Sequence, residues 1–415
     1  MTTNASYPVP KLAAEVARLI AGHPLVDAVV DQIDGRMIRV GDHWLADFAS
    51  CNYLGLDLDL DLDLKSIAGI PDYLERWGTH PSWARGIASP ALYSRVEAVV
   101  RELLGTEDVL AFPTLTHIHN GVLPALTREG TLLVDNRSHR TLHDAAVIAK
   151  ARGASVRRFR SGDVEQVERL LRGSTLPRVV CMDGVNSMTG NPPDLHAFAA
   201  LAREHDATLY VDDAHGFGVI GERSGYDPSP YGRRGNGIVR WFGESYDHVV
   251  LAAGFSKAYS SLLAFVAVST QLKQFLKVMV PAYVYGGPVP VASLASSLLG
   301  LQVNERRGDE LRALLHHRTR TVLDHLDKLG VATSNISGFP LIELAIADPE
   351  DLHAVGRLLF DHGIYVTLAP YPVVPRDEVG FRVQLTAANP AEQVDQLLDV
   401  LHEVDDRFGF RRPHP

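Results

Sequence analysis

The sequence predicts an α/β protein whose main part is a largely parallel β-sheet with helices on both faces. Between about residue 95 and residue 269, apolar runs of strand length alternate with helical stretches. Such alternation implies crossover connections and therefore parallel strands. After about residue 290 the pattern changes to a long helical stretch followed by short strands and helices, which predicts a smaller α+β domain. We expect three consecutive parts: an N-terminal segment (1–65), a large domain (66–288) and a small C-terminal domain (289–415).

The N-terminal segment predicts one helix and two short strands. Apolar residues recur at helical spacing over 9–30, and the stretch 36–49 reads as two strands joined by a Gly-Asp turn. The run DLDLDLDLK (57–65) alternates with period two and favours an acidic edge strand or an exposed linker. It lacks the loop glycine and closing glutamate of a calcium loop, so we expect no metal there.

The large domain contains seven expected strands with helices between them. The strands are 108–112, 131–135, 155–159, 176–184, 208–213, 248–255 and 264–269. The helices are 94–104, 119–126, 141–153, 164–173 and 195–205. Ligands of an open parallel sheet bind beyond the carboxyl ends of its strands, so polar residues that follow these strands are candidates for a site.

The C-terminal domain is predicted from shorter signals. We expect helices over 291–328, 350–362 and 390–404, and strands over 340–348, 364–369 and 381–387.

Composition excludes several classes of protein. The net charge is −10 and the sequence has no Lys/Arg stripe, which argues against binding to nucleic acid. No apolar run reaches the roughly 18 residues of a membrane helix, and the N-terminus lacks the apolar region of a signal peptide. The two cysteines, Cys51 and Cys181, have no metal-type spacing. A cytoplasmic enzyme is the expectation.

Four strand ends bring a lysine, two aspartates and two histidines to one edge of the predicted sheet. Asp212 and His215 follow one strand, and Lys257 follows the next. Asp183, which could equally be a strand-end cap, and His139 follow two others. Small and apolar neighbours would partly desolvate Lys257, which favours the neutral amine and Schiff-base chemistry.

Pyridoxal phosphate is the cofactor that this set of side chains suits. It needs a lysine for covalent attachment, a carboxylate opposite the pyridine nitrogen, a hydrogen-bond donor at the ring hydroxyl and a flat group on the ring. Lys257, Asp212, His215 and His139 could fill these roles in turn, with capping and loop roles as the simpler alternatives.

The motifs resemble those of the α-oxoamine synthases, a family of fold-type I pyridoxal-phosphate enzymes, and indicate a divergent member. The matching segments are SCNYLGL (50–56), DNRSHRTLHDAA (135–146), DGVNSMTGN (183–191), VDDAHGFGVIGERSG (211–225), FSKA (255–258) and RVQLTAAN (382–389). The resemblance implies a mainly parallel seven-stranded sheet in the large domain and a homodimer with its active site at the interface.

The resemblance also implies a role for each matching residue. Lys257 would attach the cofactor and move the Cα proton, Asp212 would pair with the pyridine nitrogen, and His215 and Ser187 would lie near the ring hydroxyl. His139 would stack on the ring. The weaker candidates are Asn52 and Arg382 for the substrate carboxylate, and Ser256, Thr114, Thr116 and His117 for the cofactor; the last three could equally be capping and packing groups.

Several positions depart from the family pattern. Gly254 stands where a phosphate-binding Ser or Thr is usual, and 114–120 (TLTHIHN) replaces a Ser-Gly-aromatic phosphate loop. The segments 78–86, 260–265 and 285–287 also differ. These changes indicate a remodelled substrate pocket and favour a member acting in specialised metabolism.

The resemblance predicts an acyltransferase that condenses an amino acid with an acyl thioester, of CoA or a carrier protein, and releases carbon dioxide. An aminotransferase or decarboxylase would use the same lysine and aspartate and is the first alternative. A non-catalytic partner subunit is the second, although such a subunit would be expected to lack Lys257.

Overall fold

The computed structural model describes residues 22–56, 69–371 and 374–412 and divides the chain into two compact units. The sheet unit consists of Cys51–His317 and Thr386–Ala388. The terminal unit consists of the described residues of Met1–Ser50, Arg318–Leu385 and Asn389–Pro415. The three consecutive domains expected from the sequence stay a proposal, and so does the interpretation of the run 57–65, which lies outside the described residues.

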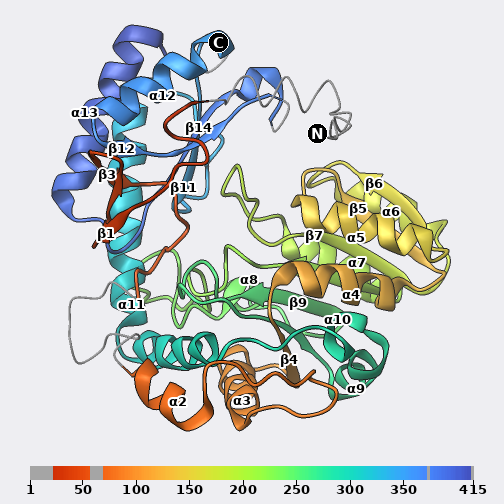
Figure 1. Cartoon of the computed structure of the whole chain (residues 1–415). Helices are drawn as coiled ribbons and strands as arrows, with labels where there is room; N and C mark the ends of the chain where they lie inside the picture. The colour runs from red at the N-terminus through yellow and green to blue at the C-terminus, as the bar shows by residue number, and fades with distance from the viewer. Residues whose placement is uncertain (1–21, 57–68, 372–373, 413–415) are drawn as a thin grey trace, which may run out of the picture. The chain divides into compact units, whose positions relative to one another are not determined.

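The sheet unit contains a seven-stranded sheet in the order β4-β10-β9-β8-β7-β5-β6 (Figure 1). Its strands are β4 (Asp108–Phe112), β5 (Thr131–Asp135), β6 (Ser155–Phe159), β7 (Arg178–Asp183), β8 (Ala207–Asp212), β9 (Val249–Gly254) and β10 (Ala264–Val268). Neighbouring strands from β9 to β6 are parallel, and β10 runs antiparallel to both of its neighbours. The predicted α/β class and mainly parallel seven-stranded sheet are confirmed.

The helices named next begin in the sheet unit, and the last of them continues past His317 into residues of the terminal unit. They are α2 (Ile70–Trp77), α3 (Ala91–Leu104), α4 (Leu115–Thr127), α5 (Arg140–Ala151), α6 (Val164–Arg172), α7 (Leu195–Glu204), α8 (Gly237–Trp241), α9 (Thr270–Met279), α10 (Pro281–Val284) and α11 (Val291–Lys328). Capping side chains explain several starts: Asp163, Asp194 and Ser269 each accept a backbone N–H of the first turn of α6, α7 and α9. Helix α4 begins at Leu115, earlier than the expected start at residue 119, because Thr114 caps it.

Alternate residues of each strand are buried against α4 and α5, which lie side by side. Cys181 of β7, Tyr210 of β8 and Ala252 of β9 belong to this core cluster. Since side chains alternate between the faces of a strand, the residues two positions further on face the same side. Asp183 and Asp212 are therefore on the α4 side of the sheet, at its carboxyl edge.

The terminal unit contains two small sheets. One has the order β1-β2-β3-β12, with β1 (Gln32–Asp34), β2 (Met37–Val40), β3 (His43–Asp47) and β12 (Ile364–Tyr365). The other has the order β11-β14-β13, with β11 (Leu341–Ala345), β13 (Thr367–Ala369) and β14 (Gly380–Gln384). Helices α12 (Leu352–Asp361) and α13 (Ala391–Phe408) complete it. The expected helix over 9–30 is wrong for residues 22–30, which form turns and bends; its beginning lies outside the described residues.

Candidate active site

A pocket of about 290 Å³ lies at the carboxyl edge of the sheet, where the loops after β7, β8 and β9 meet the start of α4. Its lining residues are Thr114, Leu115, Thr116, His119, His139, Thr141, Asp183, Val185, Ser187, Asp212, Ala214, His215, Ser256, Lys257 and Leu262. The pocket thus brings together the five side chains that were predicted at four strand ends, namely Lys257, Asp183, Asp212, His139 and His215.

Asp212 is held by a buried hydrogen-bond chain that runs through α4. His119 Nε2 lies 3.0 Å from Asp212 Oδ2, and His119 Nδ1 lies 2.8 Å from the hydroxyl of Tyr210. Burial alone would raise the pKa of Asp212, but the neighbouring His119 brings that pKa below its ordinary value. Asp212 is therefore a carboxylate that accepts from Nε2, and it also accepts the N–H of Ala214.

Asp213 faces the opposite side of the sheet. Its Oδ2 accepts the N–H of Ile238, and a Cβ at Gly216 would lie 2.1 Å from its Oδ1. Gly216 is thus required by close packing on Asp213. Gly218 has a φ of +87°, and a Cβ there would lie 2.6 Å from that of Ala258. The loop after β8 turns tightly under the pocket for these two different reasons.

His215 is fixed by a residue from far away in the chain. The hydroxyl of Tyr53 lies 2.7 Å from His215 Nδ1, and both side chains are buried. One nitrogen of the ring is therefore occupied by Tyr53, and the ring lines the pocket with Lys257.

Lys257 and Ser256 line the pocket from the loop that follows β9. Phe255 anchors this loop, because its backbone N–H donates to Leu263 at the start of the returning strand and its side chain is fully buried. The lysine is therefore placed on a rigid turn between two buried central strands.

His139 and Ser187 line the same pocket from the loops after β5 and β7. His139 is the N-cap residue of α5, and its Nδ1 lies 2.8 Å from the hydroxyl of Thr141. Its backbone N–H donates to Asp183 Oδ1 over 2.9 Å. Ser187 belongs to a turn whose N–H groups at Met188 and Thr189 donate to Asn186.

The predicted phosphate loop is the first turn of α4. Thr114 accepts the N–H of His117 and lies 2.7 Å from its Nδ1, so these two side chains cap the helix. Thr114 and Thr116 also line the main pocket. The N-terminus of a helix attracts anions through its N–H groups and dipole, so this end of the pocket suits a phosphate.

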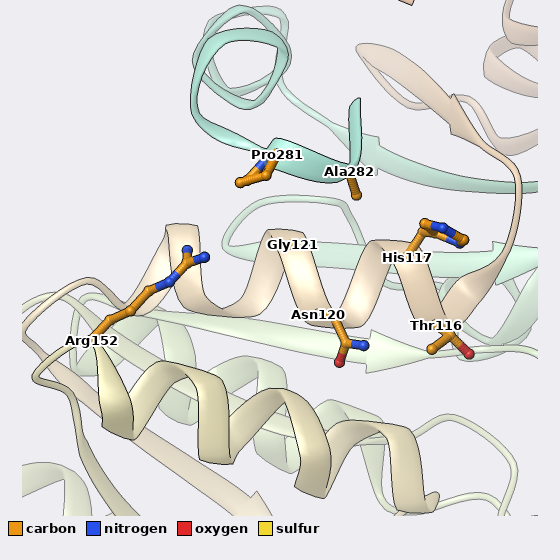
Figure 2. A pocket seen from close by; sticks show the side chains of 7 residues that line it. All are labelled: Thr116, His117, Asn120, Gly121, Arg152, Pro281 and Ala282. Carbon is orange, nitrogen blue, oxygen red and sulfur yellow. The ribbon is translucent and has the colours of Figure 1, made fainter. Parts of the chain in front are cut away.

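His117 lines a different pocket, of about 250 Å³, on the outer face of α4 (Figure 2). Asn120, Gly121, Arg152, Pro281 and Ala282 line it too, and Thr116 borders both pockets. His117 is thus a cap residue beside the main pocket and is not one of its lining residues.

Gly254 and Leu115 are complementary departures from the family pattern. A Cβ at Gly254 would lie 3.3 Å from Leu115 Cδ1 and 3.4 Å from the carbonyl oxygen of Leu263. Leu115 therefore occupies the space beside the position where the family usually has a phosphate-binding hydroxyl.

Asn52 and Arg382 are not among the residues that line the pocket. Asn52 accepts a hydrogen bond from Ser260 and the N–H of Gly55, which makes it a turn-forming residue beside the lysine loop. Arg382 lies on β14 of the terminal unit, opposite Glu343. The substrate-carboxylate roles of both residues stay predictions.

His119, Tyr53 and Tyr210 are site residues that the sequence did not predict, and Asp183 was compatible with either a site role or a strand-end cap. His119 is the last but one residue of the TLTHIHN segment and the first residue of the expected helix. With the helix start placed there, the sequence does not indicate which helix face His119 lies on. Tyr53 lies inside the matching segment SCNYLGL, next to Asn52, the residue of this segment that is predicted to bind the substrate carboxylate.

The residues of the pocket fit pyridoxal phosphate. An amine, a buried carboxylate with a lowered pKa and three imidazoles converge on one space, with a helix N-terminus at its border. This is the donor set that the cofactor requires, and Asp212 would hold the protonated ring nitrogen.

Comparison with known proteins identifies the family. The profile of the aminotransferase class I and II family matches residues 100–401. The chain belongs to this family. An 8-amino-7-oxononanoate synthase from Pseudomonas putida is 31% identical over 383 residues, which are 90% of this chain and 92% of the relative. The relative of the same name from Methylobacillus flagellatus is 29% identical and is covered to 91%.

Solved structures show the same fold. A Sphingomonas wittichii serine palmitoyltransferase superposes with a TM-score of 0.84 over 95% of this chain and 96% of that one, at 24% identity. An 8-amino-7-oxononanoate synthase from Francisella tularensis gives a TM-score of 0.71 over 87% and 98%, at 20% identity. The resemblance to the α-oxoamine synthases and the fold-type I architecture are confirmed. Among the described helices, none combines the length and the apolar character that crossing a bilayer requires.

Proposed function

We propose that this protein is a pyridoxal-phosphate-dependent C-acyltransferase that joins an amino acid to an acyl thioester. The products are an α-oxoamine, carbon dioxide and a free thiol. The observation that carries this proposal is the convergence of Lys257, Asp212 and His215 in one pocket, in a chain whose relatives are named 8-amino-7-oxononanoate synthase.

Pyridoxal phosphate, when bound, accepts the electrons of a bond broken at the substrate Cα. Asp212 would hold the protonated ring nitrogen, because His119 keeps this carboxylate in its ionised form. Lys257 Nζ is the group that would attach the cofactor and would move the proton at Cα. His215, oriented by Tyr53, would donate to the ring oxygen.

The lining residues differ along the pocket, so the phosphate and the ring of the cofactor would contact different groups. The first turn of α4 and the hydroxyls of Thr114 and Thr116 would take the phosphate. Ser187 and Ser256 line the wall, and His139 would cover the ring. The remodelled segments around this frame favour a substrate of specialised metabolism.

Release of free thiol is the reaction-specific measurement. Purified protein loaded with pyridoxal phosphate is mixed with a panel of amino acids, with and without acyl-CoA or an acyl carrier protein. The proposal predicts thiol and carbon dioxide in equal amounts, together with an α-oxoamine detected by mass spectrometry. Thiol formation with only one class of donor would identify the carrier.

Lys257→Ala should remove the visible absorption band of the lysine-bound cofactor and reduce turnover by at least about a thousandfold, because no other group can replace a covalent catalyst. Lys150→Ala, at an exposed lysine near the end of α5, is the matched control and should leave both unchanged. An unchanged absorption band in Lys257→Ala would overturn the cofactor assignment.

The same assay separates the alternatives. Amino-group transfer to an oxo acid without thiol release would indicate an aminotransferase, and carbon dioxide without thiol release would indicate a decarboxylase. Cofactor binding without turnover of any substrate would indicate a non-catalytic partner subunit.

We further propose a homodimer with the active site at its interface and a cytoplasmic location, as the family resemblance implies. Light scattering of the purified protein tests the dimer. Turnover per protomer that falls on dilution, in step with dissociation of the dimer, would support a site at the interface, and constant turnover from dissociated protomers would contradict it.

A further inference from the structure

Asp183 is a pocket residue that the proposed reaction leaves without a role. It ends β7, lines the pocket beside Lys257 and Asp212, and is 8% exposed. Its Oδ1 accepts the N–H of His139, whereas its Oδ2 is buried and has no hydrogen-bond partner among the described residues. A buried oxygen without a partner is costly, so its position in a ligand pocket calls for an explanation.

Asp183 and Asp212 are direct neighbours in the parallel register of β7 and β8. Adjacent strands are about 4.8 Å apart, and both side chains project to the α4 face of the sheet. Among the basic side chains that line the pocket, His119 is bonded to Asp212, and the charge of Lys257 acts to lower the pKa of both carboxyls. Within the described part of the chain, no ion pair joins Asp183 to a basic residue.

Two neighbouring buried carboxyls oppose each other's ionisation, and of this pair Asp212 has the basic hydrogen-bond partner. Burial, and then the charge of Asp212, hold the pKa of Asp183 well above its usual range. The backbone N–H of His139 occupies Oδ1, which leaves Oδ2 as the oxygen that carries the proton. A protonated carboxyl donates a hydrogen bond, whereas a carboxylate only accepts.

We propose that Asp183 serves the pocket as a neutral carboxylic acid and donates a hydrogen bond from Oδ2 to an anionic oxygen of the ligand that Asp212 binds. This inference rests on the proposed function. The anionic oxygen belongs either to the cofactor ring or to the carboxylate of the amino acid. The two aspartates thus have different roles. Asp212 supplies the negative charge, and Asp183 supplies a hydrogen-bond donor without adding a second charge.

The hydrogen bond to the backbone N–H of His139 gives Asp183 a second, positioning role. Because Oδ1 fixes the backbone at the N-cap of α5, the acid also positions the imidazole that lines the pocket wall. A substitution that keeps this acceptor and also offers a donor should therefore preserve the site.

The test is the same substitution at both neighbours. Asp183→Asn keeps an acceptor for His139 and offers an amide donor to the ligand, so cofactor affinity should stay within about threefold of the parent protein. Asp212→Asn removes the charge that the ring nitrogen needs and should weaken affinity by roughly a hundredfold. Asp183→Ala should weaken it by roughly tenfold, since donor and acceptor are both lost.

Affinity is measured by equilibrium titration of the refolded apoprotein with pyridoxal phosphate, first alone and then with a non-reactive amino-acid analogue. An Asp183→Ala defect with the cofactor alone assigns the acceptor to the ring, and a defect that appears only with the analogue assigns it to the amino-acid carboxylate. If Asp183→Asn is as damaging as Asp212→Asn, or if Asp183→Ala has no effect in either titration, the proposal is wrong.

Infrared difference spectroscopy of the apoproteins gives a readout that does not depend on ligand binding. The parent protein minus Asp183→Asn should show the carbonyl band of a protonated carboxyl. A carboxylate band in its place would overturn the proposal even if the variant fails to bind cofactor. If Lys257→Ala and Asp212→Asn both retain full affinity for pyridoxal phosphate, the proposed function fails, while the infrared result still decides the state of Asp183.

Discussion

The two ends of the pocket differ in how closely they follow the family pattern. At the edge formed by β8 and β9, Asp212, His215 and Lys257 are all present. Asp212 and His215 each contact a buried side chain, and the loop that carries Lys257 is anchored by Phe255. At the start of α4, the usual Ser-Gly-aromatic turn is replaced, and Leu115 packs where a hydroxyl would be expected. The end at Asp212, His215 and Lys257, which we call the ring end because it would hold the reacting ring, keeps the family's residues. The end at the first turn of α4, which would hold the phosphate, has different residues, and we call it the rebuilt end.

This difference has a physical basis. The ring end depends on one charge and one amine at defined positions, and few side chains can supply them. A phosphate can be bound by backbone N–H groups at any helix N-terminus, so the side chains around it are freer to change. The rebuilt end is therefore where we expect this chain to differ from its relatives in substrate and cofactor affinity.

Among the residues that position the site residues, the largest effect on cofactor affinity is expected at His119, which connects the two ends. This residue lies on α4 but bonds to Asp212 at the ring end. His119→Leu would leave the buried carboxylate without its main partner. A hydrogen bond to a charged group contributes about 1.5–3 kcal/mol, so cofactor affinity should fall by roughly tenfold to a hundredfold.

His117→Leu is the contrasting variant, because His117 lies two residues earlier on the outer face of the same helix (Figure 2). Its loss removes a cap contact and should change cofactor affinity by less than about threefold. Equal effects of the two substitutions, measured by cofactor titration, would show that His119 does not act through Asp212.

A medium effect is expected at the rebuilt end, from restoring the family's hydroxyl with Gly254→Ser. The new Cβ would lie 3.3 Å from Leu115 Cδ1, so the single variant should lose about 1–3 kcal/mol of unfolding free energy through overpacking. Leu115→Ala in the same protein should relieve the contact. A double-mutant cycle from urea denaturation measures the coupling, and additive effects would contradict direct packing between these positions.

The convergence of Asp212 and Lys257 in one pocket can be predicted from the sequence, whereas the arrangement at the start of α4 cannot. Asp212 and Lys257 follow long apolar runs, and the carboxyl end of a buried strand can be located from such runs alone. His119 could not be found in this way, because its role depends on the true start of α4 and on which helix face meets the sheet. Tyr53 contacts a residue far away in the chain, and no local pattern signals such a pair. Arg382 was chosen by resemblance only, and its role stays a prediction.

A smaller effect is expected from Tyr53→Phe, which tests how rigidly the ring end is held. The variant removes the hydroxyl that lies 2.7 Å from His215 Nδ1 and keeps the aromatic ring of residue 53. A neutral hydrogen bond contributes about 1 kcal/mol, so turnover should fall by roughly fivefold with little change in stability. Tyr226→Phe, at a highly exposed tyrosine, should have no effect on steady-state rates. If turnover in Tyr53→Phe equals that of the control, Tyr53 does not orient His215.

The smallest effect on the site is expected on the face of the sheet away from the pocket, at Asp213. Burial raises the pKa of Asp213 to about 8, far above its value in an unfolded chain. From the unfolded pKa up to about 8, the folded protein therefore holds a proton that the unfolded chain has released. Stability must fall as the pH rises through this window, by up to about 1.4 kcal/mol per pH unit from this group.

Asp213→Asn cannot titrate at this position, so the fall should be shallower in the variant. Urea denaturation at about pH 5 and about pH 8 measures both slopes, with Asp395→Asn on the exposed face of α13 as the control. The cofactor affinity of Asp213→Asn should stay within about threefold of the parent protein, because Asp213 does not line the pocket and its Oδ2 accepts the N–H of Ile238. Equal slopes in the parent protein and Asp213→Asn would mean that Asp213 is ionised in the fold, and a large loss of cofactor affinity would mean that the two faces of β8 are not independent.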